Sequence, residues 1–195
     1  MILIECTLRY TFLWLNIYLF FGFQSIYSII KQKVMKYFTI KEMCRSEKAT
    51  LYKIDNTPSE DIVENLTEFI EEILDPLREA WGSPIKVNSG YRCKELNAKV
   101  GGSKTSSHMS GYAADLKPCN GKIDEFFEFV KKYFIDNKID FDQIIDEYSG
   151  NAHWVHIGYK NSKGEQRKQI KMYDNGTYYL LKYDKFETEE QNNEN

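Results

Sequence analysis

The sequence predicts an α+β domain with a central, mostly antiparallel sheet packed with helices. Two segments, 57–82 and 122–137, carry apolar residues at the spacing of amphipathic helices. The short strand-like runs between and after them do not alternate regularly with helices, which argues against a parallel sheet of βαβ units. The pair Asn175-Gly176, between two aromatic-rich runs, is typical of a β-hairpin, and a hairpin joins antiparallel strands.

The segment 57–82 is predicted to be one long amphipathic helix. Thr57 and Glu60 stand in the order of a capping box, in which two side chains satisfy free backbone N–H groups of the first turn. Pro76 lacks the N–H that a continuing helix needs, so a bend or an end is expected there. Gly82 readily adopts the left-handed conformation that terminates a helix.

The other elements follow in chain order. We expect a strand over 85–92 that turns at Gly90, a short helix over 94–101, a strand over 113–118, the helix over 122–137, strands over 141–147 and 153–159, and the hairpin over 168–183. No linker or repeat divides residues 35–183, so this range is expected to be one domain. Residues 184–195 are polar and acidic, and we expect a disordered tail there.

The N-terminal segment 1–34 has a different composition. Residues 10–30 carry no charged side chain over 21 positions, which is long enough for a helix to cross a bilayer. Two interpretations stay open: a membrane anchor, or an upstream extension of the reading frame with Met35 as the natural start. A cleaved signal peptide is less favoured, because no small-residue cleavage site follows the apolar run.

Charge and cysteine content narrow the classes of partner and site. The chain has 195 residues and a formal net charge of -3, which gives no electrostatic reason to expect nucleic acid as a partner. Its four cysteines are irregularly spaced without a CxxC pair, so neither a thiolate zinc site nor a dense disulfide framework is indicated. We expect free thiols and a monomeric protein.

All three histidines lie in two short segments, SSHMSGYAADLKP and HWVHIGY. His108, Asp115 and His156 offer the three ligands that a catalytic zinc ion takes from histidine and carboxylate, with a fourth position left for water. Gly111 can make the tight turn that returns the chain from His108 to Asp115. Spacing alone leaves a metal site and ordinary hydrogen-bonded structural residues equally open.

These motifs resemble the D-Ala-D-Ala carboxypeptidase family of zinc peptidases, especially its short phage and gut-bacterial forms. SSHMSGYAAD matches the family pattern SxHxxGxAxD, and HWVHIGY matches its downstream WxH pattern. With VNSGYRC and MKYFTIKEMC included, the resemblance covers about residues 35–160. It implies an α+β fold of the hedgehog/DD-peptidase type, and it favours Met35 as the beginning of the domain.

The resemblance also implies roles for individual residues. His108, Asp115 and His156 become the ligands of Zn²⁺. Arg92 becomes the residue that holds the substrate, because its planar charged fork can form two hydrogen bonds to a carboxylate and can stabilise an oxyanion. Ser106 matches a family position near the metal and is assigned to substrate binding. Without the resemblance, an ordinary surface arginine and a loop hydroxyl are the preferred interpretations.

The general base is expected to be His153, three positions before His156, where the family more often carries an acidic residue. An imidazole, with an ordinary pKa of about 6.5, suits proton transfer at neutral pH. Residues three apart on a regular strand face opposite sides, so this assignment requires a bend just before His153. Asp146 or Glu147 is the alternative base, in which case His153 is structural.

The predicted function is zinc-dependent hydrolysis of amide bonds in peptidoglycan stem peptides, at the bacterial cell envelope or in phage lysis. The terminal D-Ala-D-Ala bond and an internal bond such as L-Ala-D-Glu are both candidates. A zinc-binding module of the same fold without catalysis stays open, because the acid before Trp154 is missing. A membrane protein anchored through residues 10–30, with structural histidines, is a third possibility.

Overall fold

The computed structural model describes residues 35–181, and the segments 1–34 and 182–195 lie outside the described residues. The interpretations of residues 10–30 as an anchor or an extension, and of residues 184–195 as a disordered tail, fall on these segments. Within residues 35–181, no helix combines the length and the apolar character needed to cross a bilayer.

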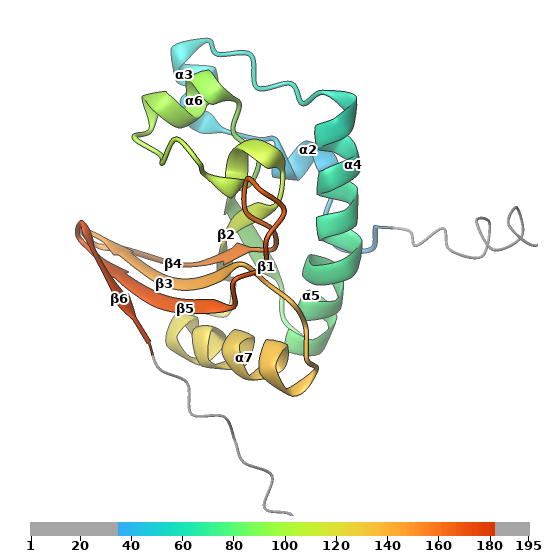
Figure 1. Ribbon diagram of the computed structural model, residues 1–195, viewed down its shortest axis with the longest axis vertical. Helices are drawn as coiled ribbons and strands as arrows, with labels where there is room; N and C mark the ends of the chain where they lie inside the picture. The colour runs from blue at the N-terminus through green and yellow to red at the C-terminus, as the bar shows by residue number, and fades with distance from the viewer. Residues whose placement is uncertain (1–34, 182–195) are drawn as a thin grey trace, which may run out of the picture. The chain divides into compact units, whose positions relative to one another are not determined.

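Six strands form one mixed sheet in the order β1-β2-β4-β3-β5-β6 (Figure 1). The strands are β1 (Ile85–Ser89), β2 (Ala113–Pro118), β3 (Gln143–Ser149), β4 (Ala152–Gly158), β5 (Gln169–Asp174) and β6 (Thr177–Leu180). Every neighbouring pair is antiparallel except β3 and β5, which run parallel. This sheet confirms the predicted α+β class and its mostly antiparallel pairing.

Helices surround the sheet without alternating with its strands. They are α2 (Ile40–Met43), α3 (Glu47–Tyr52), α4 (Glu60–Phe69), the π-helical turn η1 (Ile70–Leu74), α5 (Asp75–Trp81), α6 (Lys94–Lys99), the 3₁₀ turn η2 (Ser107–Ser110) and α7 (Ile123–Asp136). In Figure 1, α7 lies along one face of the sheet and α4 and α5 stand at its side.

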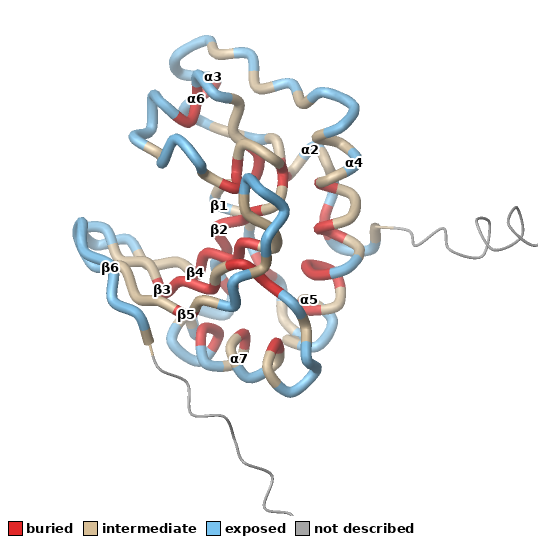
Figure 2. The backbone as a smooth tube through the Cα atoms, in the orientation of Figure 1, coloured by how far each residue is buried: buried red, intermediate tan, exposed pale blue. Residues whose placement is uncertain are grey.

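The hydrophobic core joins buried residues of α4, η1, α5 and α7 with those of the sheet. Between α7 and the sheet, buried apolar side chains come from both layers: Phe126, Val130 and Phe134 from α7, and Ile144, Val155 and Ile157 from β3 and β4. Figure 2 shows the buried segments gathered in the middle of the sheet and on the inner sides of the helices. Because side chains alternate along a strand, Ile145 and Glu147 of β3 and Trp154 and His156 of β4 face away from α7.

The long predicted helix begins later than its sequence suggests. α4 starts at Glu60 after Ser59, which makes no capping hydrogen bond through its side chain. The N–H of Thr57 instead donates to the carboxylate of Asp55 at 2.9 Å. The expected capping box of Thr57 and Glu60 is therefore wrong, because Glu60 occupies the first helical position rather than the third.

The second half of this helix shows how it accommodates a proline. The π-helical turn Ile70–Leu74 lies directly before α5, and Pro76 occupies the first turn of α5. A regular α-helix has no room for a proline ring and loses one hydrogen bond there, so the wider turn relieves the conflict. Gly82 ends α5 in the left-handed conformation, at φ +72°, as expected.

The predicted hairpin is confirmed between β5 and β6. Asp174 pairs with Thr177, so the connecting loop has only Asn175 and Gly176. Both loop residues have positive φ, 42° and 107°, which is the requirement of a tight turn that matches the twist of the strands. The hairpin extends the sheet beyond β3 (Figure 1).

Asp75 ties the beginning of the described chain to α5. Its buried carboxylate accepts hydrogen bonds from the backbone N–H groups of residues 36–38, including Tyr37 at 3.0 Å and Phe38 at 3.2 Å. The side chain of Phe38 is only 2% exposed and belongs to the core. Residues just after Met35 are therefore part of the packed domain.

Candidate metal centre and substrate cavity

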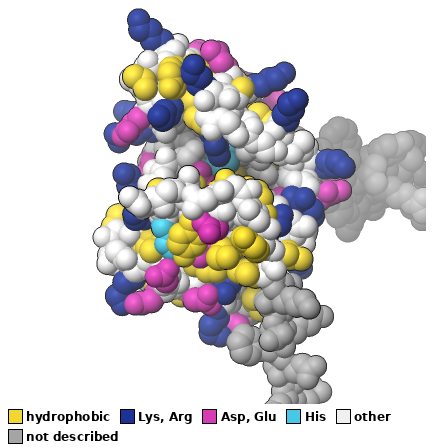
Figure 3. Space-filling model, turned by 90° about the vertical axis from the view of Figure 1, so that its left-hand side faces the viewer, with side chains coloured by type: hydrophobic (Ala, Val, Ile, Leu, Met, Phe, Trp, Pro, Cys, Tyr) yellow, Lys and Arg dark blue, Asp and Glu magenta, His cyan; other side chains and the backbone are white. Residues whose placement is uncertain are grey.

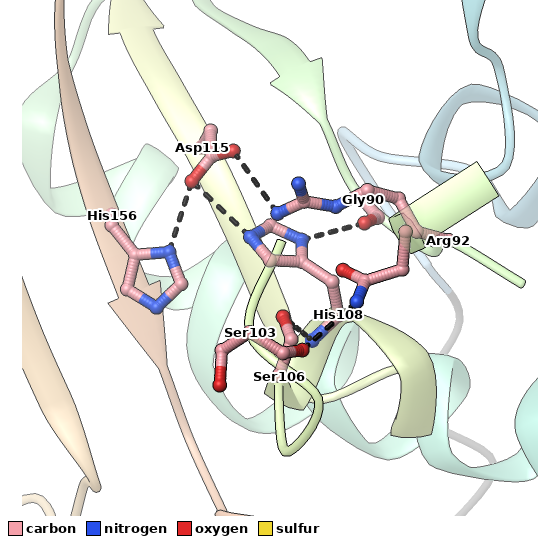
Figure 4. A network of polar contacts seen from close by, with 8 residues as sticks. Gly90, Arg92, Ser103, Ser106, His108, Asp115 and His156 are labelled. Carbon is pink, nitrogen blue, oxygen red and sulfur yellow. Dashed lines mark hydrogen bonds and ion pairs between the residues drawn. The ribbon is translucent and has the colours of Figure 1, made fainter. Parts of the chain in front are cut away.

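Three neighbouring elements bring His108, Asp115 and His156 together (Figure 4). Asp115 on β2 and His156 on β4 are direct cross-strand partners. His108 comes from η2, which ends at Gly111 with φ +78° and leads the chain into β2, so the expected tight turn is confirmed. One possible ligand atom from each of the three residues lies within 4.8 Å of the other two.

Contacts with α4 hold η2 in place. The amide of Asn65 donates to the carbonyl of Ser110 at 2.9 Å. A Cβ atom added to Gly111 would lie only 3.2 Å from the carbonyl oxygen of Ile62 and from the side chain of Leu66. Glycine is needed here for its positive φ and for this close approach. The turn that carries His108 is thus packed directly against the helix.

His108 presents a bare nitrogen to Asp115. Its Nδ1 lies 2.7 Å from the carbonyl oxygen of Gly90, and because a carbonyl can only accept, Nδ1 carries the proton. In a neutral imidazole, Nε2 then holds a lone pair, and this atom lies 3.3 Å from Asp115 Oδ1. Among the described residues, buried Nε2 has no hydrogen-bond partner. Two electron-rich atoms therefore face each other across a short gap.

These residues fit a cation such as zinc. Burial lowers the pKa of His108, which favours the neutral form that binds metal. Burial raises the pKa of Asp115, but the contact with His156, whose Nδ1 lies 2.9 Å from Asp115 Oδ1, acts against it, and the pKa lies below its usual range. Asp115 is therefore a charged carboxylate. Two imidazoles and one carboxylate are a donor set typical of zinc.

The cluster lines an open cavity of about 500 Å³. One wall is the loop over residues 100–108, and the other is the face of the sheet turned away from α7. Figure 3 looks onto this side and shows the molecule hollowed between its upper part and the strands below. The alternate residues of β3 and β4 line the cavity: Gln143, Ile145, Glu147 and Ser149, and Trp154 and His156.

Arg92 and Ser106 both lie in this cavity, beside the cluster (Figure 4). Arg92 Nη2 is 3.7 Å from Asp115 Oδ2, and its side chain is 17% exposed, so the guanidinium remains accessible from the cavity. Ser106 caps η2, and its hydroxyl oxygen accepts the N–H of His108 at 3.4 Å. The structure therefore brings together five of the six residues singled out from the sequence.

The sixth residue, His153, lies on the opposite face of β4. Its Nε2 is 2.6 Å from Asp146 Oδ1, its ring stacks on Tyr148, and Asp124 of α7 lies 3.8 Å from its Nδ1. The bend that would turn it toward the cavity is absent, because β3 and β4 pair residue by residue from Gln143 to Ser149. This placement corrects the expectation that His153 reaches the cluster.

Glu147 is a second carboxylate, besides Asp115, that the sheet places in the cavity. It lies opposite Trp154 in the pairing of β3 with β4, two residues from the partner of His156. Burial raises the pKa of Glu147, and the charge of Asp115 raises it further, while His156 and Arg92 oppose the shift. The sequence left Asp146 and Glu147 open as alternatives, and the structure places them on opposite faces of β3, with only Glu147 in the cavity.

The hairpin contributes cavity residues that no motif identified. Lys171 and Tyr173 of β5 and Tyr178 of β6 line the end of the cavity away from Arg92. The alternation of Lys171 and Tyr173 places them on one face of a strand. Which strand lies next to β5 depends on a parallel pairing that leaves no local signal in the sequence.

Comparison with known proteins gives the same family as the motifs. A family model described as Peptidase M15 matches residues 36–157. A zinc D-Ala-D-Ala carboxypeptidase of Streptomyces albus G is 50% identical over 44 residues, which make up 22% of this chain and 17% of that protein. The scaffold shared with the hedgehog signalling domain stays a prediction. The family match covers more than half of the chain, and the chain therefore belongs to the Peptidase M15 family.

Proposed function

We propose that this protein is a zinc-dependent peptidase that hydrolyses amide bonds of peptidoglycan stem peptides at the cell envelope. The observation that carries the proposal is the bare, buried Nε2 of His108, which faces the charged carboxylate of Asp115 beside His156 at an open cavity. A purely structural histidine would be expected to satisfy this buried nitrogen with a hydrogen-bond donor. The membership in Peptidase M15 supports the same chemistry.

His108, Asp115 and His156 would hold the zinc ion. The carbonyl of Gly90 orients His108, because it fixes the proton on Nδ1 and leaves Nε2 for the metal. When bound, zinc supplies a Lewis acid that lowers the pKa of water and polarises a carbonyl oxygen. Proton transfer and substrate binding are the work of side chains of the protein.

Glu147 is the general base of the proposal. A carboxylate with a raised pKa can take a proton from the attacking water and later deliver it to the leaving amine. Glu147 extends from the same face of the sheet as His156, whereas His153 and Asp146 bond to each other on the other face. The missing acid before Trp154, which favoured a module without catalysis, therefore has a substitute within the cavity.

Arg92 is the anchor for the substrate. Its guanidinium lies 3.7 Å from Asp115 Oδ2, and the Nε atom is buried without a hydrogen-bond partner among the described residues. A planar fork at this position suits a peptide carboxylate next to the bond that is cut. The name of the Streptomyces albus G protein favours the terminal D-Ala-D-Ala bond over an internal one. Ser106, which lines the loop wall of the cavity, would contact the same peptide.

The decisive test combines metal content with digestion of the natural polymer. Purified protein should carry about one zinc per chain, and it should release D-Ala from peptidoglycan with pentapeptide stems, as measured by mass spectrometry of the products. His156→Ala should lose most of the zinc and the activity. His153→Ala is the matched control, because His153 lies outside the cluster, and this variant should keep the zinc. Full zinc occupancy in His156→Ala would contradict the ligand assignment, and release of L-Ala–D-Glu cleavage products would assign the internal bond.

A further inference from the structure

The cavity contains three cations, and they differ in how they are neutralised. Arg92 lies beside the charged Asp115. Arg167 forms two hydrogen bonds with the buried carboxylate of Asp142, at 2.6 and 2.9 Å. Lys171 makes no ion pair with a carboxylate among residues 35–181, and its ammonium lies 5.7 Å from the ring centre of Tyr178. Lys171 is thus the cavity cation whose charge is left for a ligand.

Lys171 lies in the same row of the sheet as two of the proposed metal ligands. Asp115 pairs with His156, His156 pairs with Ile145, and Ile145 pairs with Lys171. Two strand spacings separate His156 from Lys171, which is roughly 10 Å between their Cα atoms. Arg92 contacts Asp115 at the other end of this row. The candidate metal centre therefore lies between two cations.

The surroundings of Lys171 keep it half-buried at the end of the cavity. Tyr173 and Tyr178 line this end, with ring centres 4.7 Å apart. Burial lowers the pKa of Lys171, and the nearby Arg167 lowers it further, as expected for an ammonium that is partly removed from water without its own carboxylate. An anion at this point would replace lost hydration and relieve the repulsion between the two cations.

We infer that Lys171 forms a second anion subsite, which binds a substrate carboxylate on the side of the scissile bond opposite to the one held by Arg92. The inference rests on the proposed peptidase function and specifies its substrate class: peptides with a carboxylate two to three residues before the bond. An extended peptide advances about 3.3–3.6 Å per residue, so this separation spans the roughly 10 Å between the metal centre and Lys171.

Two fluorescein-labelled probe peptides test the subsite. Both have the sequence L-Ala–γ-D-Glu–L-Lys–D-Ala–D-Ala, and they differ only in the D-Glu α-carboxylate, which is free in one and a carboxamide in the other. Binding is measured by fluorescence anisotropy on the zinc-loaded full-length chain with Glu147→Gln, which prevents turnover during the measurement. We expect about tenfold tighter binding of the free carboxylate, decreasing as salt is added.

Substitutions at two lysines isolate the source of this preference. Lys171→Met should bring the ratio of the two affinities close to one, while Lys171→Arg, which keeps the cation, should retain the preference. Lys168→Met is the matched control, because Lys168 pairs with Asp140 at 2.6 Å and does not line the cavity. Equal binding of both probes, a preference that survives Lys171→Met, or its loss in Lys168→Met would overturn the inference.

Hydrolysis of the same probes is followed separately with the unaltered chain. If the peptides bind with the Lys171-dependent preference but are not cut, the anion subsite stands and the peptidase function fails. If both are cut equally well and bound equally well, the peptidase function stands and the subsite fails. The two proposals are therefore tested independently.

Discussion

At the scale of single residues, the site depends on which protons are fixed and which are free to move. Gly90 fixes the proton of His108 on Nδ1, at a position where even one Cβ atom on Gly90 would lie 2.3 Å from the carbonyl oxygen of Met43. Glu147 has the opposite character, because its raised pKa brings its proton exchange closer to neutral pH. The proposed metal ligand His108 is thus held in one protonation state, whereas the proposed base Glu147 can exchange its proton.

The assignment of the base leads to a contrast between Glu147→Gln and His153→Gln. Glu147→Gln should keep its zinc while the turnover rate falls on the order of a hundredfold or more, because an amide cannot accept the proton. His153→Gln should keep turnover within about threefold per folded molecule. It should lower the free energy of unfolding by about 1–3 kcal/mol, since buried Asp146 loses its partner.

The pH dependence of the turnover rate is a second way to tell whether Glu147 or His153 is the base. Glu147 must be deprotonated to act as a base, so the rate should fall as the pH drops through its raised pKa. This acidic limb should lie above the ordinary range of a glutamate and should be missing in Glu147→Gln. Loss of turnover in zinc-loaded His153→Gln, with Glu147→Gln active, would return the role of base to His153.

At the scale of elements, the junction of α4, η2 and β2 positions His108, the first of the proposed metal ligands. Its geometry depends on Gly111, where a positive φ coincides with close contact to Ile62 and Leu66. Gly164 offers a comparison, because it has nearly the same φ, +79° against +78°, but an added Cβ atom would meet no other atom within 4 Å. The two glycines therefore separate backbone strain from steric crowding.

Replacing each of these glycines with alanine should give different losses of stability. Gly164→Ala should cost about 1 kcal/mol of unfolding free energy from its positive φ alone. Gly111→Ala should cost an additional 1–3 kcal/mol or so, because the new methyl group overlaps Ile62 and Leu66. Its zinc affinity should also fall, since η2 must move with His108. Urea unfolding and competition with a chelator measure both effects, and equal losses for the two variants would contradict the role given to α4.

At the scale of the whole molecule, residues 36–38 complete the packing on α5. Three backbone N–H groups bond to the buried carboxylate of Asp75, and Phe38 enters the core. Residues 36–38 are thus part of the packed domain. The family match begins at residue 36, next to the boundary predicted at Met35.

A pair of shortened chains tests this boundary. Residues 35–183 should fold, bind zinc and hydrolyse substrate as the full chain does. Residues 40–183 should be less stable by about 3 kcal/mol or more, because Asp75 loses its donors and Phe38 no longer fills the core. Guanidinium unfolding compares the three chains. Aggregation of residues 35–183 beside a soluble full-length protein would show that residues 1–34 belong to the fold.

Local signals were sufficient for most elements and for the proposed metal ligands. Apolar spacing predicted the helix over 57–82, and Asn175-Gly176 predicted the hairpin, because both depend on a few neighbouring residues. The position of the helix start was missed, since Asp55 competes for the N–H of Thr57. The π-helical turn was not specified either, because it reflects how Pro76 is accommodated within a packed helix.

The sequence by itself determined the candidate metal ligands, because His108, Asp115 and His156 lie in motifs that match those of one family. Only the tertiary structure decided which acid lines the cavity beside them. A strand's period of two says that Asp146 and Glu147 point to opposite sides, but α7 must cover one side before the other becomes a cavity. Lys171 joined the site through the parallel pairing of β5 with β3, a contact between distant segments that no local pattern records.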